Sequence, residues 1–426
     1  MIKPEPALPA KTKASFFYGY IIVGLIFIIQ LAMVGSSATS GIFFKPLINE
    51  FGWSRALISG AFSFSRIMQG LSGIIMGGLN DRLGPRVVIT ICGFLAGAGF
   101  MLMSRTSAVW QLYLYYVVIL GVGMGGVFAP QMSTIARWFT QRRNLMTGIV
   151  FIGGSLGGLL TPPAVNWLIS TAGWQNSYLI IGAVALVIIV LAAQFLRGDP
   201  YRGVRVTSAK NDKPEIREAE PIIILKSFSL KEAVSTRQFW IVTMAFFSSQ
   251  FCLSTLMVHI VPHATDLGIS SAAAANILAV LSAGFLFGCL AVGIGADRIG
   301  VRKVYVICLI PMLAILLLLL PVSEAWLIGL LVFIVSFGNG GNAPLVSTLC
   351  AELFGMRSHG LILGLSSLIG ALGGALGPFV AGYVFDTTGN YRWAFIWCGA
   401  LVVAGLVMAV LLRPIKAGTR DSPSPL

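Results

Sequence analysis

Residues 77–86 read Gly-Gly-Leu-Asn-Asp-Arg-Leu-Gly-Pro-Arg, and residues 293–302 read Gly-Ile-Gly-Ala-Asp-Arg-Ile-Gly-Val-Arg. The same offset of 216 residues aligns further glycines and prolines, placing Gly148, Gly154, Pro162 and Gly173 opposite Gly364, Gly370, Pro378 and Gly389. One half of the chain therefore repeats the other. A repeat of this length predicts two copies of one structural unit.

The composition indicates that most of the chain is surrounded by lipid. Of its 426 residues, 57% are hydrophobic and 10% are charged, and the mean hydropathy is +0.88. A soluble protein carries about 25% charged residues, which this chain lacks. Stretches long enough to cross a bilayer, about 20 residues each, lie near 17–44, 56–79, 87–104, 109–136, 144–170, 175–196, 238–264, 272–295, 303–321, 325–351, 360–384 and 393–412. We predict an all-α membrane protein with 12 transmembrane helices in two pseudo-symmetric six-helix bundles.

The apolar stretches divide the chain into five parts. They are an N-terminal tail (1–16), an N-terminal bundle (17–196), a charged linker (197–237), a C-terminal bundle (238–412) and a C-terminal tail (413–426). The first apolar run is too long for a signal peptide and lacks a small-residue cleavage site, so it is predicted to be a retained span. The linker is read as a solvated connector, with a regulatory or partner-binding role as the alternative. Within it, Ser229-Leu230-Lys231-Glu232-Ala233 predicts the start of a short surface helix.

The basic residues predict the orientation in the membrane. The chain has 29 Lys and Arg against 15 Asp and Glu, a formal charge of +14. All but five of the basic residues fall in the tails, the linker and the loops that hold Arg82, Arg142, Arg143, Arg302 and Arg357. This positive-inside pattern places both termini in the cytoplasm of a bacterial-type inner membrane. It accounts for the charge without a nucleic-acid partner.

No residue cluster indicates an enzyme. The six cysteines lie in apolar stretches without a Cys-x-x-Cys spacing, so they are predicted to be small packing residues rather than metal ligands or disulfides. The chain has no Ser-His-Asp grouping, histidine pair or metal-spaced set. The glycine-rich stretches at 148–158 and 364–374 lie mid-span with no following lysine, so they indicate close helix packing rather than phosphate binding. We expect no catalytic residue, metal or cofactor.

The repeated Gly-x-x-x-Asp-Arg-x-Gly-x-Arg stretch resembles the signature loop of the major facilitator superfamily, and it occurs in both halves. Acidic residues beside arginines at a helix end can latch two spans across the interface between bundles in one state and release them in another. A simple topology anchor is compatible with this reading. We predict a conformational latch made of Asp81, Arg82, Arg86, Asp297, Arg298 and Arg302.

Other stretches resemble the monocarboxylate transporter and oxalate:formate antiporter branch of that superfamily. They are Phe51-Gly52-Trp53-Ser54-Arg55, Ala136-Arg137-Trp138-Phe139, Gln141-Arg142-Arg143, Gln238-Phe239-Trp240, Val258-His259-Ile260-Val261-Pro262, Ala351-Glu352-Leu353-Phe354-Gly355, Gly377-Pro378 and Asp386-Thr387-Thr388-Gly389-Asn390-Tyr391. The resemblance covers about residues 17 to 412. It implies a monomer with alternating access to a central cavity, and small organic anions as the usual cargo.

The chain departs from that branch where its relatives carry a substrate anchor. The arginine that many of them have midway along span eight is Cys289 here, and an acidic residue four positions earlier is Phe285. A tyrosine common in span four is replaced by Phe128. Counted from the nearest loops at 1.5 Å per residue, Cys289 and Phe128 lie about 12 and 13 Å deep. Sites between the two halves form near this depth, so all three residues are candidate substrate contacts.

Two asparagines and one arginine are further candidates for the cavity. Asn339 and Asn342 lie on one helix face, with hydrogen bonding between helices as the alternative role. Arg66 is the only basic residue placed inside a span, about 22 Å from Asp81 along the helix. Because a guanidinium in hydrocarbon costs at least ~3 kcal/mol, Arg66 should face a cavity or a partner. We interpret it as supplying the anion-binding charge missing from span eight, with snorkelling to the surface as the alternative.

His259, near the outer end of span seven, is a side chain able to titrate near neutral pH, whereas His263 lies closer to the surface. It is a candidate for proton coupling or substrate binding, and a satisfied interfacial histidine is the alternative. Together these features predict a secondary transporter for a small organic anion, by proton symport or by exchange. The alternatives are a carrier for a neutral or amphipathic solute in the same fold, and a receptor or scaffold that moves no solute.

Overall fold

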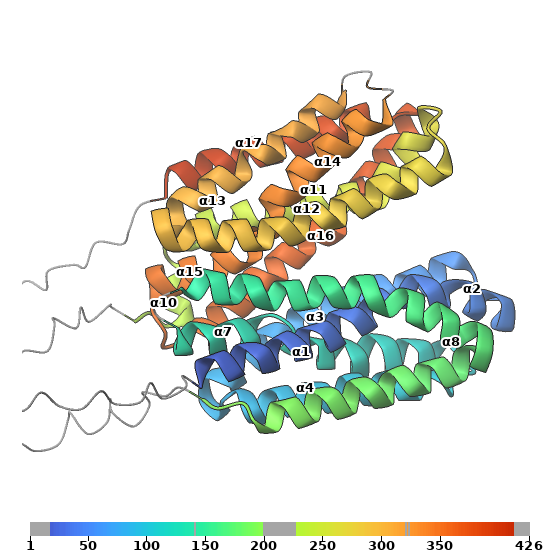
Figure 1. The fold of residues 1–426 in the computed structure, drawn as a ribbon, viewed down its shortest axis with the longest axis horizontal. Helices are drawn as coiled ribbons and strands as arrows, with labels where there is room; N and C mark the ends of the chain where they lie inside the picture. Colours follow the sequence, from blue (N-terminus) through green and yellow to red (C-terminus); the bar gives the residue numbers. More distant parts are fainter. Residues whose placement is uncertain (1–17, 140–141, 199–226, 320–321, 323, 413–426) are drawn as a thin grey trace, which may run out of the picture.

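The computed structural model describes residues 18–139, 142–198, 227–319, 322 and 324–412 (Figure 1). All regular structure in these ranges is helical. Both predicted tails and residues 199–226 of the predicted linker lie outside the described part.

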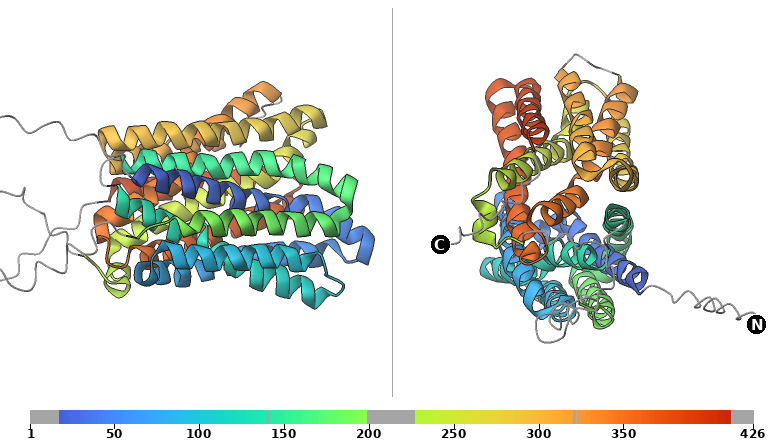
Figure 2. Two further views of the ribbon diagram at one scale, coloured as in Figure 1. Left: turned by 60° about the horizontal axis from the view of Figure 1, so that its bottom comes forward. Right: turned by 90° about the vertical axis from the view of Figure 1, so that its left-hand side faces the viewer.

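The N-terminal half supplies six spans whose helices run along the long axis of the molecule (Figure 2). Its elements are α1 (Gly19–Ala38), α2 (Ser40–Phe51), α3 (Arg55–Leu83), α4 (Pro85–Met103), α5 (Val109–Leu112), η1 (Tyr113–Leu120), α6 (Gly121–Gly123), η2 (Met124–Gly126), α7 (Ala129–Trp138) and α8 (Arg143–Gln194). The fourth span is built from five of these, α5 to α7, because its backbone leaves the α-helical form between Tyr113 and Gly126.

The C-terminal half repeats this plan. A short helix, α10 (Leu230–Val234), precedes α11 (Arg237–Asp266), α12 (Ser271–Ile299), α13 (Val301–Leu309), η3 (Pro311–Leu319), α14 (Ala325–Gly340), α15 (Asn342–Phe354), α16 (His359–Thr388) and α17 (Arg392–Val410). The predicted surface helix is confirmed as α10, where Ser229 and Glu232 form a reciprocal capping box. The tenth span breaks at Gly341, which the repeat places opposite Gly125 in the broken part of the fourth span.

Nine helical stretches within the described ranges are long and apolar enough to cross a membrane, and they account for ten of the twelve spans. The 52-residue α8 is two spans, because its backbone turns sharply at Gly173, with φ 80° and ψ 164°. Only glycine adopts such a conformation at low cost. The other two spans are α3, whose 29 residues reach about 44 Å, and α13 with η3.

Glycines in the repeated motif explain the tight turns after the second and eighth spans. Gly84 and Gly300 have φ values of 85° and 94°, and each ends one helix and starts the next. The end of the molecule that holds these turns is named the signature end below, and the end that holds Gly173 is named the opposite end. Figure 1 shows the two bundles together at the signature end, where α7 and α15 lie, and apart toward α2.

Candidate functional site

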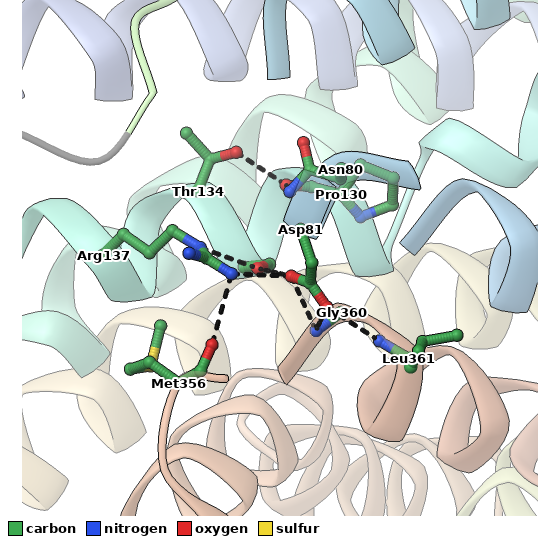
Figure 3. A network of polar contacts seen from close by, with 9 residues as sticks. Asn80, Asp81, Pro130, Thr134, Arg137, Met356, Gly360 and Leu361 are labelled. Carbon is green, nitrogen blue, oxygen red and sulfur yellow. Dashed lines mark hydrogen bonds and ion pairs between the residues drawn. The ribbon is translucent and has the colours of Figure 1, made fainter. Parts of the chain in front are cut away.

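Asp81, at the signature end of α3, joins the two bundles (Figure 3). Its carboxylate accepts hydrogen bonds from the backbone N–H groups of Gly360, at 3.2 and 3.0 Å, and Leu361, at 3.4 Å, in the first turn of α16. Arg137 of α7 forms an ion pair with the same carboxylate at 2.6 Å and donates to the carbonyl of Met356 at 3.3 Å. A carboxylate of one bundle therefore caps a helix N-terminus of the other, where the helix dipole favours negative charge.

Asp297, at the signature end of α12, makes the same connection in the reverse direction. It accepts from the backbone N–H groups of Asn144, at 3.2 Å, and Leu145, at 3.0 Å, at the start of α8. The offset of 216 residues maps these two partners onto Gly360 and Leu361, the partners of Asp81. The two-fold repeat thus holds at the level of single hydrogen bonds.

The two halves of this latch differ in burial and charge. The Asp81 side chain is 7% exposed and has an arginine partner, whereas Asp297 is exposed. The position equivalent to Arg137 is Leu353, and the Asn144 side-chain amide donates to Asp297 at 2.8 Å instead. The latch is therefore stronger at Asp81 than at Asp297.

Two of the four arginines predicted to share the latch form hydrogen bonds within their own bundles. Arg86 donates to the side-chain oxygen of Gln194 at 2.9 and 3.1 Å, and Arg302 donates to the carbonyl of Val410 at 3.1 Å. Gln194 and Val410 are again 216 residues apart, so each arginine ties the third and sixth helices within its own bundle. The prediction that they join the two bundles is corrected accordingly. The remaining pair, Arg82 and Arg298, are exposed.

Small residues bring the backbones of opposite bundles into contact beside the latch. A side chain on Gly77 of α3 would collide with Gly360 of α16, and one on Gly148 of α8 would collide with the carbonyl oxygen of Cys289 of α12. Close helix approach of this kind needs glycine on at least one side. Cys289 therefore lies in the packed interface, and its thiol donates to the carbonyl of Gly340 at 3.0 Å.

Contact between the bundles ends partway along α3. Gly70 is buried against Leu368 of α16, but Arg66, one turn farther toward the opposite end on the same helix face, is exposed. Ser63, the next residue along that face, is also exposed, and on α16 Phe379 is 71% exposed. The bundles are thus closed at the signature end, and Arg66 lies just beyond the point of closure.

Arg66 shares a small cavity with a set of polar side chains of the N-terminal bundle. The cavity measures about 30 Å³, room for roughly two water-sized groups. Its lining residues are Ser37, Ser40, Phe62, Ser65, Arg66, Gln69, Tyr116, Leu120 and Met124. Gln69 donates to the carbonyl of Met124 at 3.3 Å, which fixes α3 against the broken fourth span. A guanidinium beside hydroxyl groups is suited to a carboxylate, which accepts several charge-assisted hydrogen bonds.

The residues that replace the usual anchor separate into two groups. Phe128 lies between the bundles, with its ring centroid 6.1 Å from Phe151 of α8 and 6.3 Å from Phe246 of α11. Phe285 is half-buried, and its backbone packs with that of Cys289 against Gly340 of α14. Of the three, Phe128 has the placement of a cavity residue.

Asn339 and Asn342 lie on one face, as their spacing indicates, but they point into the C-terminal bundle. Both side-chain amides donate to the hydroxyl of Ser249 in α11, at 3.0 and 2.6 Å. Their exposed fractions are 2% and 0%. The geometry therefore favours the alternative role, a hydrogen-bond network that closes the break between α14 and α15.

Replacing Ser249 by alanine should destabilise the fold without changing substrate affinity. Two buried amide groups would lose their shared acceptor, at a cost of about 1–3 kcal/mol. Thermal unfolding in detergent measures this loss. Ser248→Ala is a matched control, because that hydroxyl bonds only to the Ala245 carbonyl of its own helix. Equal unfolding temperatures for the two variants would contradict the assignment.

His259 has partners for both ring nitrogens inside the C-terminal bundle. Nε2 lies 2.9 Å from the carbonyl oxygen of Pro378, and Nδ1 lies 3.2 Å from the hydroxyl of Tyr391. Since a carbonyl can only accept, Nε2 carries a proton, and the Tyr391 hydroxyl is a partner for Nδ1. With both ring nitrogens bonded, the imidazole ties α11 to α16, which favours the alternative role for His259.

His259→Gln is therefore expected to lower thermal stability and to leave the pH dependence of uptake in place. The measurement is the rate of uptake as a function of external pH, for His259→Gln and for Tyr391→Phe. The second variant removes one of the two hydrogen bonds of His259 but keeps the imidazole. A flattened pH profile in His259→Gln alone would assign the coupling proton to this side chain.

Several functional residues carry no sequence signal of their own. Arg137 lies in a motif of the family branch, but the motif does not single it out. Asn144 lies outside the quoted motifs, and the repeat offset points to it once Gly360 is known to bind Asp81. By contrast, Ser40 and Tyr116 are ordinary span residues, and only the packing of α2 and η1 against α3 brings them to Arg66.

Comparisons with known proteins agree with this architecture. The family model described as Major Facilitator Superfamily matches residues 26–299 and 260–426. Human monocarboxylate transporter 11 is 29% identical, covering 94% of this chain and 83% of its own length. The oxalate:formate antiporter of Oxalobacter formigenes is 27% identical, covering 95% of this chain and 94% of its own.

Solved structures share the fold at lower sequence identity. The fucose:proton symporter of E. coli has a TM-score of 0.69 and 16% identity, with 93% of this chain and 100% of that chain covered. The predicted twelve-span fold and the predicted family resemblance are both confirmed. The chain belongs to the major facilitator superfamily and is a multi-pass membrane transporter, not an enzyme, with monocarboxylate transporters and an oxalate:formate antiporter among its relatives.

Proposed function

We propose that this chain is a secondary transporter that moves a small organic anion by alternating access, with Arg66 as the anion anchor. The observation that carries the proposal is the position of Arg66, exposed one helical turn beyond the closure of α3 on α16. A charged side chain within the span region is costly in hydrocarbon, so it faces a cavity, a partner or a ligand. A carboxylate that enters between the bundles from the opposite end can reach Arg66.

The positive-inside pattern supports a cytoplasmic position for the signature end, in a bacterial-type inner membrane. The closed latch would then correspond to a state that is open to the outside. In the other state, Asp81 and Asp297 must release the N-termini of α16 and α8. Substrate binding between the bundles can offset that loss, which couples occupancy of the cavity to the change of state.

Uptake by purified protein in liposomes tests the proposal. Labelled lactate, oxalate, formate and an aromatic acid would each be supplied with and without an inward proton gradient, or with an unlabelled anion inside. Stimulation by the gradient indicates symport, and stimulation by internal anion indicates exchange. A failure to accumulate any carboxylate above protein-free liposomes would exclude an anion carrier and favour the scaffold alternative.

A further inference from the structure

Three phenylalanines form an apolar surface between the bundles. Phe128 stacks on Phe246, with an interplanar angle of 15°, and meets the edge of Phe151. Phe246 is 4% exposed and packs against Gly370 of α16, whereas Phe128 and Phe151 are half-buried. We name this set the aromatic floor. It draws on both bundles, since Phe128 and Phe151 come from the N-terminal half and Phe246 from the C-terminal half.

The aromatic floor lies on the signature side of the Arg66 cavity. Met124 lines that cavity, and Phe128 follows it by four residues along the fourth span, toward the signature end. On α3, Gly70 is also one turn from Arg66, and it packs against Leu368, two residues from Gly370. A ligand held at Arg66 therefore has the aromatic floor, as well as the Gln69 amide, on its signature side.

We propose that the substrate is a monocarboxylate with an aromatic or similarly bulky apolar group, an inference that rests on the proposed function. The carboxylate would bind Arg66 and the neighbouring hydroxyls, and the apolar group would lie on Phe128 and Phe151. Ring stacking and removal of apolar surface from water would both favour such a ligand over a short hydrophilic acid.

Equilibrium binding to the purified full chain tests this assignment with three probes: acetate, phenylacetate and 2-phenylethanol. We expect phenylacetate to bind at least about tenfold more tightly than either of the others. Acetate lacks the ring and 2-phenylethanol lacks the carboxylate. Phe128→Leu should remove most of the advantage of phenylacetate over acetate.

Phe151→Leu provides a second variant at the aromatic floor, and Phe64→Leu is the matched control. Phe64 is 54% exposed on α3 and its ring contacts Tyr113, away from the aromatic floor. Thermal unfolding shows which variants are folded. Unchanged preference for phenylacetate in the folded aromatic-floor variants would overturn the proposal.

The outcomes separate this proposal from the one on which it rests. Equal binding of acetate and phenylacetate, with both lost in Arg66→Ala, would overturn the aromatic substrate and leave the anion carrier standing. Binding of neither acid, or binding that does not depend on Arg66, would overturn both. Tight binding of 2-phenylethanol would instead assign the aromatic floor to a neutral solute.

Discussion

Arg66→Ala is expected to reduce carboxylate uptake by roughly 10- to 150-fold while the protein still reaches the membrane. Hydrogen bonds to a charged group contribute about 1.5–3 kcal/mol, and every 1.4 kcal/mol is a factor of ten in affinity. The loss should appear in KM for uptake, because the guanidinium holds the ground-state anion. Arg66→Lys keeps the charge but not the planar pair of donors, so we expect it to retain part of the activity.

Uptake by proteoliposomes with matched protein content measures the effect. Arg105→Ala is the control, since Arg105 is exposed beyond the end of α4 and its removal changes the net charge equally. Thermal unfolding of both variants shows that the fold is retained. Uptake by Arg66→Ala equal to that of Arg105→Ala would leave the cavity without its proposed anchor, and snorkelling would then explain Arg66.

The repeat made much of the interface predictable from sequence. Asp81 and Asp297 were identified because one motif occurs twice, and the structure places each at the same point of the opposite bundle. The motif predicts the positions of the tight turns, because positions 84 and 300 have positive φ and therefore favour glycine. What the motif could not distinguish is which charged residue crosses the interface and which stays within its own bundle.

The candidate site was less predictable, for a geometric reason. Counting residues along a helix gives the depth of a side chain but not the direction in which it points. Asn342 and Cys289 have suitable depths, yet their side chains turn toward Ser249 and Gly340 inside the C-terminal bundle. Asn342 follows the break at Gly341, so counting along one continuous helix does not give its direction. For Cys289, the direction depends on how α12 packs against α14.

Asp81→Asn is expected to open the signature end and abolish net transport, whereas Asp297→Asn should reduce transport only a few-fold. Removing one partner of a buried ion pair costs about 3–5 kcal/mol, because the other charge stays in the low-dielectric interior. Asp81 is buried beside Arg137 in this way. Asp297 is exposed, and within the described ranges no lysine or arginine lies within 4.0 Å of its carboxylate. A shift of 3–5 kcal/mol changes the ratio of the two states by roughly 10² to 4 × 10³.

Leu361 packs against Gly78 across the interface, so a cysteine introduced there reports on the opening. The measurement is the rate at which a membrane-impermeant maleimide, applied to the signature end, labels this cysteine. Background labelling should be small, because the six native cysteines are at most 3% exposed. The reporter cysteine should be labelled much faster in Asp81→Asn than in the parent protein, and only slightly faster in Asp297→Asn. The double variant Asp81→Asn/Arg137→Gln removes both charges of the pair, so it should recover part of the closed state. Equal labelling of the two single variants would contradict the asymmetry of the latch, because burial and the arginine partner would then carry no weight in holding the bundles closed.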